Sequence, residues 1–261
     1  MADDVLAGEG GELTPRRITV DDLRAVLRLG WADFLRAPAF GLFFGGFYAA
    51  GGILLWWALT TAGQIWWTIP ITLGFPLLGP FVAVGFYEIS RRLEAGRPLD
   101  WPGVLGVIVQ QKDRQIPSIA AIIVVFFLFW NFVAHMIFAL FLGTQVMTNI
   151  STSYAVLLTP NGLAMLALGT LVGAAFAGVL FCLTVVALPL LLDREVDFVT
   201  AMITSFAVVR ENPGTMLAWG AIVAGLLFVG MLPMFLGLVA VLPLLGHATW
   251  HLYRRAVAVE G

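Results

Sequence analysis

Two histidines near the C-terminus, His247 and His251, have the spacing most typical of a chemical site. Residues four apart lie on one face of a helix, so the two imidazoles could bind one metal ion together. A third ligand could come from Glu88, expected at the matching end of its own helix, or from Asp193. Two histidines alone do not make a metal site. We therefore expect no bound cofactor, and the alternative is a carrier that holds a metal ion or haem through His247, His251 and Glu88.

A second polar pair, Asn131 and His135, lies inside an apolar segment rich in aromatic residues. The amide and the imidazole are one helical turn apart and point the same way. A hydrogen bond between helices is the expected role, and a contact with haem or a quinone is the alternative. At 1.5 Å per residue, His135 is roughly 25 Å and His247 about 10 Å from the same end of their helices, so we do not expect both to ligate one haem.

Other chemistry finds little support in the chain. It has no phosphate-binding glycine loop, nucleophile elbow, His-Glu-x-x-His run or pair of redox cysteines. Cys182 is the single cysteine, which excludes an intramolecular disulfide, and the net charge of −2 gives no electrostatic basis for binding nucleic acid. No charged residue lies at the centre of a hydrophobic segment, where coupled transporters commonly carry one. We therefore expect a protein that is not an enzyme.

The elements that carry these residues are membrane helices. Hydrophobic residues make up 60% of the chain and charged residues 11%, with a mean hydropathy of +0.95, which is typical of a bilayer protein. Several apolar segments reach the length of about 20 residues that a helix needs to cross a bilayer. The sequence predicts an all-α membrane protein with six spans, at residues 39–60, 66–86, 117–142, 163–192, 215–229 and 232–253. We expect these spans to form three hairpins. In the last one, only Gly230 and Met231 connect the fifth and sixth spans, which must therefore form a tight antiparallel hairpin.

The charged residues predict the topology. All 14 Lys and Arg and all 16 Asp and Glu can be placed on one side of the membrane without cutting a span. Basic residues in short loops are retained in the cytoplasm, so we expect both termini there, in the inner membrane of a bacterium. Residues 1–15, which are acidic and unlike a signal peptide, are expected to be a disordered tail, and residues 16–261 a single integral membrane domain.

The segment before the first span predicts an amphipathic helix. Thr19 and Asp22 form a capping-box pattern at its start. Its apolar residues are Leu23, Val26, Leu27, Gly30, Trp31, Phe34 and Leu35, and its opposite face carries Arg24, Arg28, Asp33 and Arg36. We expect this helix to lie among the lipid headgroups with its apolar face toward lipid, anchored by Trp31, Arg24, Arg28 and Arg36. A docking site for a partner protein is the alternative.

A threefold internal repeat is a further prediction. Asp22, Asp100 and Asp197 each precede an arginine by 13 or 14 residues. A proline follows each arginine closely and is expected to open the next odd-numbered span: Pro38, Pro117 and Pro213. We expect repeat units at residues 18–92, 98–195 and 196–256, each an amphipathic helix followed by a transmembrane hairpin. Small residues at four-residue spacing predict close helix packing, preferably within one chain: Gly41, Gly45 and Ala49 in the first span, and Gly169, Gly173 and Ala177 in the fourth.

Two stretches resemble the bacterial integral membrane proteins grouped as domain of unknown function 2189. They are Ile18 to Phe43, with Asp21-Asp22-Leu23-Arg24 and Gly30-Trp31-Ala32-Asp33-Phe34, and the run His247-Ala248-Thr249-Trp250-His251-Leu252-Tyr253-Arg254. The resemblance covers nearly the whole chain and implies a multi-pass inner-membrane protein without an established activity. Some members of the family are labelled as similar to cytochrome oxidase subunits. The three histidines of this chain cannot supply an oxidase core, which needs histidines opposed at one depth.

Three functions agree with this pattern. The first is an accessory, structural or assembly partner of a larger membrane complex, of respiratory type if the family labels apply. The second is a transporter or channel for a small neutral solute that uses the prolines of the even-numbered spans. The third is the metal or haem carrier described above. An uncovered apolar or aromatic face would favour the first, and a polar cavity at mid-membrane near Asn131 and His135 the second.

Overall fold

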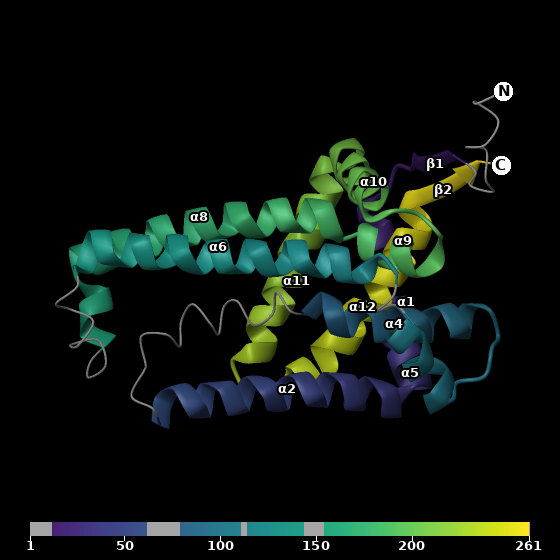
Figure 1. Cartoon of the computed structure of the whole chain (residues 1–261), viewed down its shortest axis with the longest axis horizontal. Coiled ribbons are helices and arrows are strands. Elements are labelled where there is room, and N and C mark those ends of the chain that lie inside the picture. Colours follow the sequence, from purple (N-terminus) through teal and green to yellow (C-terminus); the bar gives the residue numbers. More distant parts are fainter. Residues whose placement is uncertain (1–11, 62–78, 111–113, 144–153, 261) are drawn as a thin grey trace.

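The computed structural model describes residues 12–61, 79–110, 114–143 and 154–260. These residues are almost entirely helical, as predicted, and Figure 1 shows the arrangement. The helices are α1 (Val20–Arg36), α2 (Pro38–Thr61), α4 (Gly79–Glu94), α5 (Trp101–Gln110), α6 (Ile116–Leu142), the 3₁₀ helix η3 (Tyr154–Leu158), α8 (Pro160–Thr184), α9 (Ala187–Asp193), α10 (Phe198–Glu211), α11 (Pro213–Met231) and α12 (Leu238–Ala256). Two short strands, β1 (Glu12–Pro15) and β2 (Val257–Glu260), complete the described fold.

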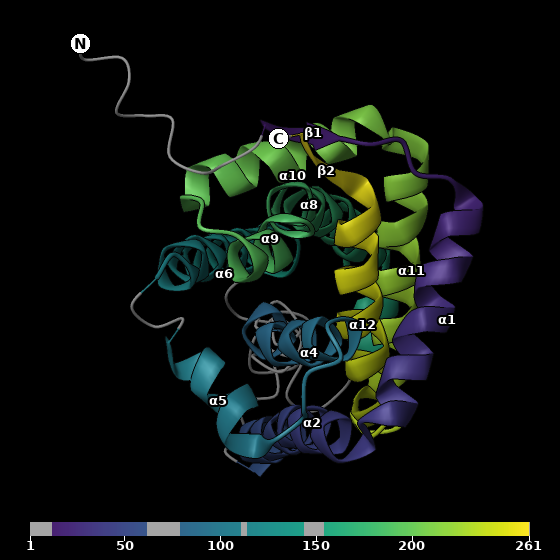
Figure 2. The same ribbon diagram turned by 90° about the vertical axis from the view of Figure 1, so that its right-hand side faces the viewer.

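The long helices α2, α6 and α8 lie along the long axis of the molecule, whereas α1 and α10 run across it and α11 and α12 cross it obliquely (Figures 1 and 2). Four stretches of the described chain are long and apolar enough to cross a membrane: Pro38–Ala58, Ile116–Leu142, Pro160–Asp193 and Pro213–Met231. They agree with the first, third, fourth and fifth predicted spans. Most of the second predicted span lies outside the described residues, and α12, the sixth, is not among the four. Six spans therefore remain a prediction.

Proline opens helices where the sequence predicts it. Pro38 and Pro213 are the first residues of α2 and α11, and Pro117 follows Ile116 at the start of α6. A proline is tolerated there because the first turn of a helix has no partners for its N–H groups. The fourth predicted span differs from the prediction, since it is broken into α8 and α9. Pro189 lacks the N–H that would continue the helix from Val185.

A serine from another helix satisfies this break. The Ser205 hydroxyl of α10 accepts a hydrogen bond from the Val186 N–H at 3.1 Å and donates one to the Cys182 carbonyl at 2.8 Å. Ser205 is fully buried. The two helices and α10 therefore meet at one fixed corner.

The connection between α11 and α12 is longer than predicted. Residues 232–237 form turns, so α12 begins at Leu238 rather than directly after Met231. Met234 and Phe235 have φ values of 52° and 65° in these turns. A Cβ atom on Gly237 would come within 2.7 Å of the Gly230 Cα. The two helices are thus brought together by glycines that flank the turns.

The two ends of the described chain pair with each other. β1 and β2 are antiparallel, with Leu13 opposite Val259 and Pro15 opposite Val257. The predicted disordered tail therefore cannot extend to residue 15, because residues 12–15 form a strand. Residues 1–11 of that predicted tail lie outside the described part of the chain. The sequence prediction missed this pair because four-residue strands far apart in the chain leave no local periodicity.

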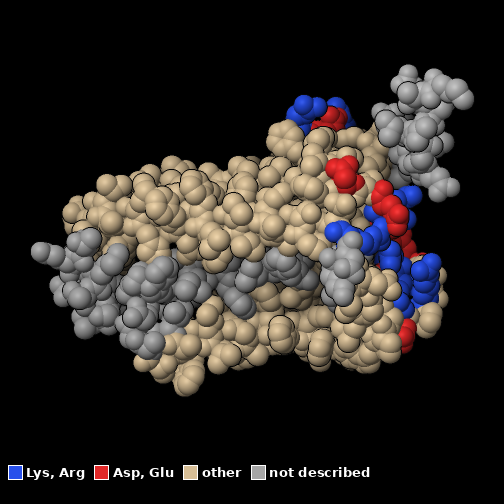
Figure 3. Space-filling model, in the orientation of Figure 1, with Lys and Arg blue, Asp and Glu red and all other residues tan. Residues whose placement is uncertain are grey.

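Small residues mediate helix packing within the chain, as predicted. A Cβ atom on Gly45 of α2 would meet the Val239 carbonyl oxygen of α12 at 2.8 Å, and one on Gly173 of α8 would meet the Trp130 ring of α6. Gly169 differs, because an added Cβ would meet nothing within 4 Å. On the face seen in Figure 3, charged side chains gather at the end that carries α5, α9 and α10. The candidate functional site lies at this charged end.

Candidate functional site

The last turns of α12 are the centre of the charged end. Residues 247–255 include the whole of the distinctive run found in the sequence, and they contact α1, α4 and α9 through polar side chains. We call these side chains and their partners the polar hub. The partners are Asp22 and Asp33 of α1, Ser90 and Glu94 of α4, and Asp193 of α9.

Asp33 is the buried acid of the hub. Its Oδ2 atom accepts hydrogen bonds from the Ser90 hydroxyl at 2.9 Å and from His251 Nε2 at 2.7 Å. Ser90 Oγ lies 2.8 Å from His247 Nδ1. Ser90 and His247 are fully buried, and Asp33 is nearly so. One carboxylate thus joins α1, α4 and α12.

These contacts determine where the protons lie. A carboxylate can only accept, so Ser90 must donate its single hydroxyl proton to Asp33. The Ser90 oxygen can then only accept from His247, which places the proton of a neutral His247 on Nδ1. The hydroxyl of Ser90 is thereby committed to Asp33 and shielded from any substrate. The Ser, His and Asp side chains therefore do not form the nucleophile arrangement of a hydrolase, in which the imidazole activates an accessible hydroxyl.

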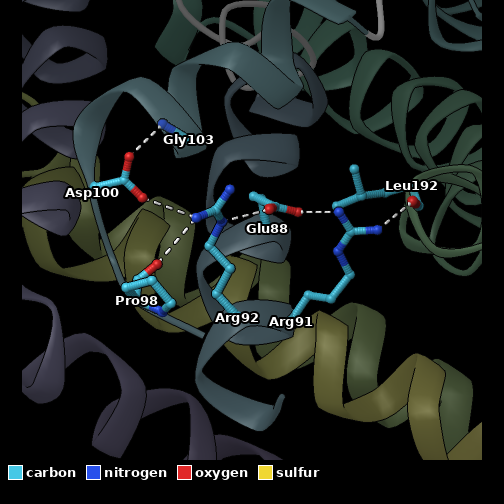
Figure 4. Close-up of polar contacts among 7 residues, drawn as sticks. All are labelled: Glu88, Arg91, Arg92, Pro98, Asp100, Gly103 and Leu192. Carbon is cyan, nitrogen blue, oxygen red and sulfur yellow. Dashed lines mark hydrogen bonds and ion pairs between the residues drawn. The ribbon is translucent and has the colours of Figure 1, made fainter. Parts of the chain in front are cut away.

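Glu88, predicted as a metal ligand, belongs to a different cluster (Figure 4). Its carboxylate forms ion pairs with Arg91 at 2.6 Å and Arg92 at 2.7 Å. Arg92 also donates to the Pro98 carbonyl at 3.0 Å and to Asp100 at 3.1 Å. Among the described residues, no group of three or more His, Cys, Asp or Glu side chains is placed to hold a metal ion. His247 and His251 do share one face, but Asp33 rather than Glu88 is their acidic partner.

The Glu88 cluster fixes three helices. Arg91 donates to the Leu192 carbonyl of α9 at 3.1 Å, and Asp100 accepts from the Gly103 N–H at 2.9 Å, which caps the start of α5. A Cβ atom on Gly103 would lie 2.6 Å from the Arg92 guanidinium nitrogens, so a larger residue here would displace that side chain. The ion pair of Arg92 with Asp100 therefore joins α4 to α5, and the hydrogen bond from Arg91 to Leu192 joins it to α9.

The outer part of the hub completes the attachment of α12. Trp250 Nε1 donates to Glu94 at 3.0 Å, and the Tyr253 hydroxyl donates to Asp193 at 2.7 Å. Arg255 pairs with Asp22 at 2.6 Å. Asp193, the other predicted metal ligand, thus accepts from Tyr253. The polar side chains of this run are used to hold helices together.

Helix α1 differs from the predicted interfacial helix in one respect. The capping box of Thr19 and Asp22 is confirmed. However, its apolar face packs on α12 rather than facing away from the protein: a Cβ atom on Gly30 would lie 2.6 Å from the Ala248 backbone nitrogen. Asp33, assigned to the solvent face, is on this buried face as well. Trp31, Arg24, Arg28 and Arg36 are all exposed.

Sequence spacing contains a signal that would have found Asp33. Leu23, Val26, Gly30, Asp33 and Ala37 follow alternating steps of three and four residues, which is the seam of two packed helices. The pattern is not apparent from polarity alone, because the acidic Asp33 interrupts an otherwise apolar series. A carboxylate in such a seam predicts a buried partner with a donor.

Asn131 and His135 each have a contact within their own helix, and the predicted bond between helices stays a prediction. Asn131 Nδ2 donates to the Phe127 carbonyl at 2.9 Å, and His135 Nδ1 lies 2.6 Å from the Asn131 carbonyl oxygen. Both contacts are to the preceding turn of α6. They satisfy the Asn131 Nδ2 and His135 Nδ1 atoms within the helix.

We expect the hub to make the stability of the protein depend on pH. His247 lies outside the four candidate spans, and burial lowers its pKa from 6.5 to about 4, an effect that the nearby Asp33 carboxylate partly offsets and His251 adds to. Below pH 6.5 the unfolded chain therefore binds a proton that the folded chain excludes. We expect the contribution of His247 to the free energy of unfolding to be fully present above pH 6.5. It should decrease as the pH drops toward 4, with a slope approaching about 1.4 kcal/mol per pH unit. Titration of SDS into mixed micelles at several pH values would measure this slope.

The His247→Gln variant is the control, because a glutamine amide can still donate to Ser90 but does not titrate. Its profile should be flatter between pH 6.5 and 4 than that of the unmodified protein. Asp33 acts in a separate window: burial raises its pKa, but hydrogen bonds from His251 and Ser90 outweigh this and bring it below 3.8. Its contribution is therefore lost only at pH values below 3.8. A variant profile as steep as that of the unmodified protein would contradict the role of His247.

A family model matches the middle of the chain. Residues 68–193 match the family model described as predicted integral membrane protein (DUF2189). The match includes the Glu88 cluster, but it is shorter than the resemblance implied and contains neither residues 18–43 nor residues 247–254, on which that resemblance rests. No curated protein and no solved structure matches the chain.

Proposed function

Since this chain carries the domain of the DUF2189 family of predicted integral membrane proteins, we propose that it is a non-catalytic accessory or assembly partner of a larger membrane complex. The observation that carries the proposal is an uncovered aromatic face on α6. The partner that we assign to this face is a transmembrane helix of another protein.

The face is one continuous stripe along α6. Its residues follow steps of four, three, four and four positions, and each is between 48% and 76% exposed: Val125, Phe129, Phe132, Met136 and Leu140. We call this set the aromatic stripe. The Phe129 and Phe132 rings are stacked with centroids 6.5 Å apart, and Phe129 also contacts Phe176 of α8 at 5.7 Å. Rings already held in place lose little entropy on binding, which is typical of the anchor residues of an interface.

The polar groups of α6 support an accessory role over a transporter. Asn131 and His135 each form a hydrogen bond to the backbone of their own helix, so fewer of their polar atoms are available to bind a solute. In the hub, the Ser90 hydroxyl and the Asp33 carboxylate are likewise used internally. These contacts thus serve the fold, and an exposed apolar surface is available for contacts with other molecules.

The topology proposed with this function places the charged end in the cytoplasm of a bacterium. Exposed arginines gather there, among them Arg24, Arg28, Arg36, Arg97 and Arg210. Retention of basic residues on the cytoplasmic side of the inner membrane supports this orientation. The aromatic stripe would then lie within the bilayer, where a partner helix can reach it laterally.

Photo-crosslinking in native membranes tests the partner. A benzoylphenylalanine residue at Phe129 should yield one discrete product with an integral membrane protein, identified by mass spectrometry. The same residue at Leu217, an exposed position on α11, should give at most about a tenth of this product. Purification in a mild detergent should recover the same protein in a fixed ratio, without a visible absorption band from this chain.

The Phe129→Ala/Phe132→Ala double variant should lose this recovery, and the matched Leu217→Ala/Phe228→Ala variant on α11 should keep it. Purification of the unmodified chain alone, with no specific product at Phe129, would contradict an accessory role. A haem or metal absorption band on this chain would instead favour the carrier function.

A further inference from the structure

Three helices at the charged end, α1, α5 and α10, each have a second apolar face that points away from the protein. Figure 2 looks onto this end and shows α10, α1 and α5 on three different sides of the bundle. Each helix has one face packed inward and a stripe of large apolar side chains outside. We call these three helices the collar.

Helix α10 shows the pattern most simply. Ala201, Ser205 and Val208 are buried against the protein, whereas Val199, Ile203 and Phe206 are exposed in steps of four and three residues. Arg210, four residues after Phe206, continues the exposed line. This outer stripe is apolar along the helix and ends in one positive charge.

The other two helices repeat this pattern. On α1 the exposed line contains Val20, Arg24, Arg28, Trp31 and Leu35, so that two basic side chains lie between apolar ones. On α5 the line consists of Trp101, Leu105 and Val109. The nine apolar side chains of the three stripes are between 37% and 64% exposed. Isolated exposed apolar residues are ordinary, but aligned stripes on three helices mark an interaction surface.

The collar is continuous with the membrane-facing surface of the first candidate span. Trp101 of α5 contacts two aromatic rings of α2, Phe40 at 4.1 Å and Phe43 at 5.2 Å between centroids. Phe43 is itself exposed on that span. The apolar surface therefore passes from α2 to α5 without a polar boundary, at the level where charged residues begin.

We infer that the collar lies in the headgroup layer of one leaflet and binds anionic phospholipids there. The exposed arginines of α1 and α10 complement the headgroup charge, while the apolar stripes and Trp31 fit the boundary with the acyl chains. The three stripes face different directions around the bundle, so a single protein partner would not cover them all, whereas a leaflet surrounds the bundle. This inference is independent of the proposed partner of α6.

Measurements of membrane depth test whether the collar lies in the headgroup layer. In a Cys182→Ser background, single cysteines at Leu35, Val109 and Ile203 would carry an NBD fluorophore in nanodiscs of phosphatidylcholine and phosphatidylglycerol. We expect quenching by lipids with a doxyl group near the headgroup, and a quenching constant for aqueous iodide about five-fold lower than that of a label at Glu195. Glu195 is the control because its side chain is 91% exposed at the same end. Equal iodide quenching at Ile203 and Glu195 would overturn the inference.

Lipid analysis tests the anionic component. The Arg24→Gln/Arg28→Gln variant should retain about half as much phosphatidylglycerol as the unmodified protein after purification in mild detergent. The Arg97→Gln variant is the control, since Arg97 is exposed but lies outside the collar. Equal phosphatidylglycerol in all three proteins would overturn the proposed recognition of anionic lipid.

Discussion

Replacing Glu88 with alanine is expected to lower the free energy of unfolding by about 3–5 kcal/mol, the cost of removing one partner from a buried ion pair. The Glu88 side chain is 1% exposed and neutralises two arginines at once. Without it, the guanidinium groups of Arg91 and Arg92 would face each other in a site that excludes most water. Titration of SDS into mixed micelles, followed by tryptophan fluorescence, would measure the change.

The matched control for this prediction is Glu195→Ala. Glu195 also pairs with an arginine, Arg114, at 2.6 Å, but its side chain is 91% exposed. Exposed ion pairs contribute roughly 0–1 kcal/mol, so this variant should be close to the unmodified protein. The two variants remove the same chemical group at nearly the same distance and differ in burial. Similar losses in both would contradict a structural role for the Glu88 cluster.

The second large effect is expected at Gly30, where α1 meets α12. An alanine Cβ at this position would lie 2.6 Å from the Ala248 nitrogen and 2.8 Å from the Leu244 carbonyl oxygen. These are backbone atoms, so the helices must move apart rather than repack side chains. We expect Gly30→Ala to reduce the free energy of unfolding by about 1–3 kcal/mol, because overpacking outweighs the gain in helix propensity of about 1 kcal/mol.

Gly46→Ala separates these two contributions. Gly46 lies inside α2, and an added Cβ would meet nothing within 4 Å. This variant should be neutral or more stable than the unmodified protein, since only the gain in helix propensity remains. The same SDS titration applies. Gly30→Ala should also weaken the hub, because movement of α1 displaces Asp33 from Ser90 and His251. A gain in stability at Gly30 equal to that at Gly46 would show that α1 and α12 are not in close contact.

Sequence reasoning predicted the features that depend on neighbouring residues. The capping box of Thr19 and Asp22, the prolines that begin α2, α6 and α11, and four long apolar helices all follow from patterns within a few turns. The four-residue separation of His247 and His251 also predicted that they share one face of a helix. Such patterns are local because capping, propensity and periodicity are properties of single helices.

The features that were missed depend on contacts between distant segments. Ser90 is 157 residues from His247, and Asp33 is 218 residues from His251. The corner between α8 and α9 requires Ser205 from another helix. Glu88 was considered as a ligand for His247 and His251, but arginines three and four residues along its own helix are nearer in the chain and neutralise it. Polarity alone did not reveal which acidic groups the fold buries.

The pairing of β1 with β2 bears on how the chain is completed during synthesis. The strand β1 is among the first described segments to be made, but its partner is the last. The next residues depend on late segments as well, since the Ile18 N–H donates to Asn212, 194 residues along the chain, at 2.8 Å. Closing such long separations is slow compared with forming a helix. Strand β1 and Ile18 therefore cannot form these contacts until the segments around Asn212 and β2 have been made, so the described fold is completed by contacts between early and late segments.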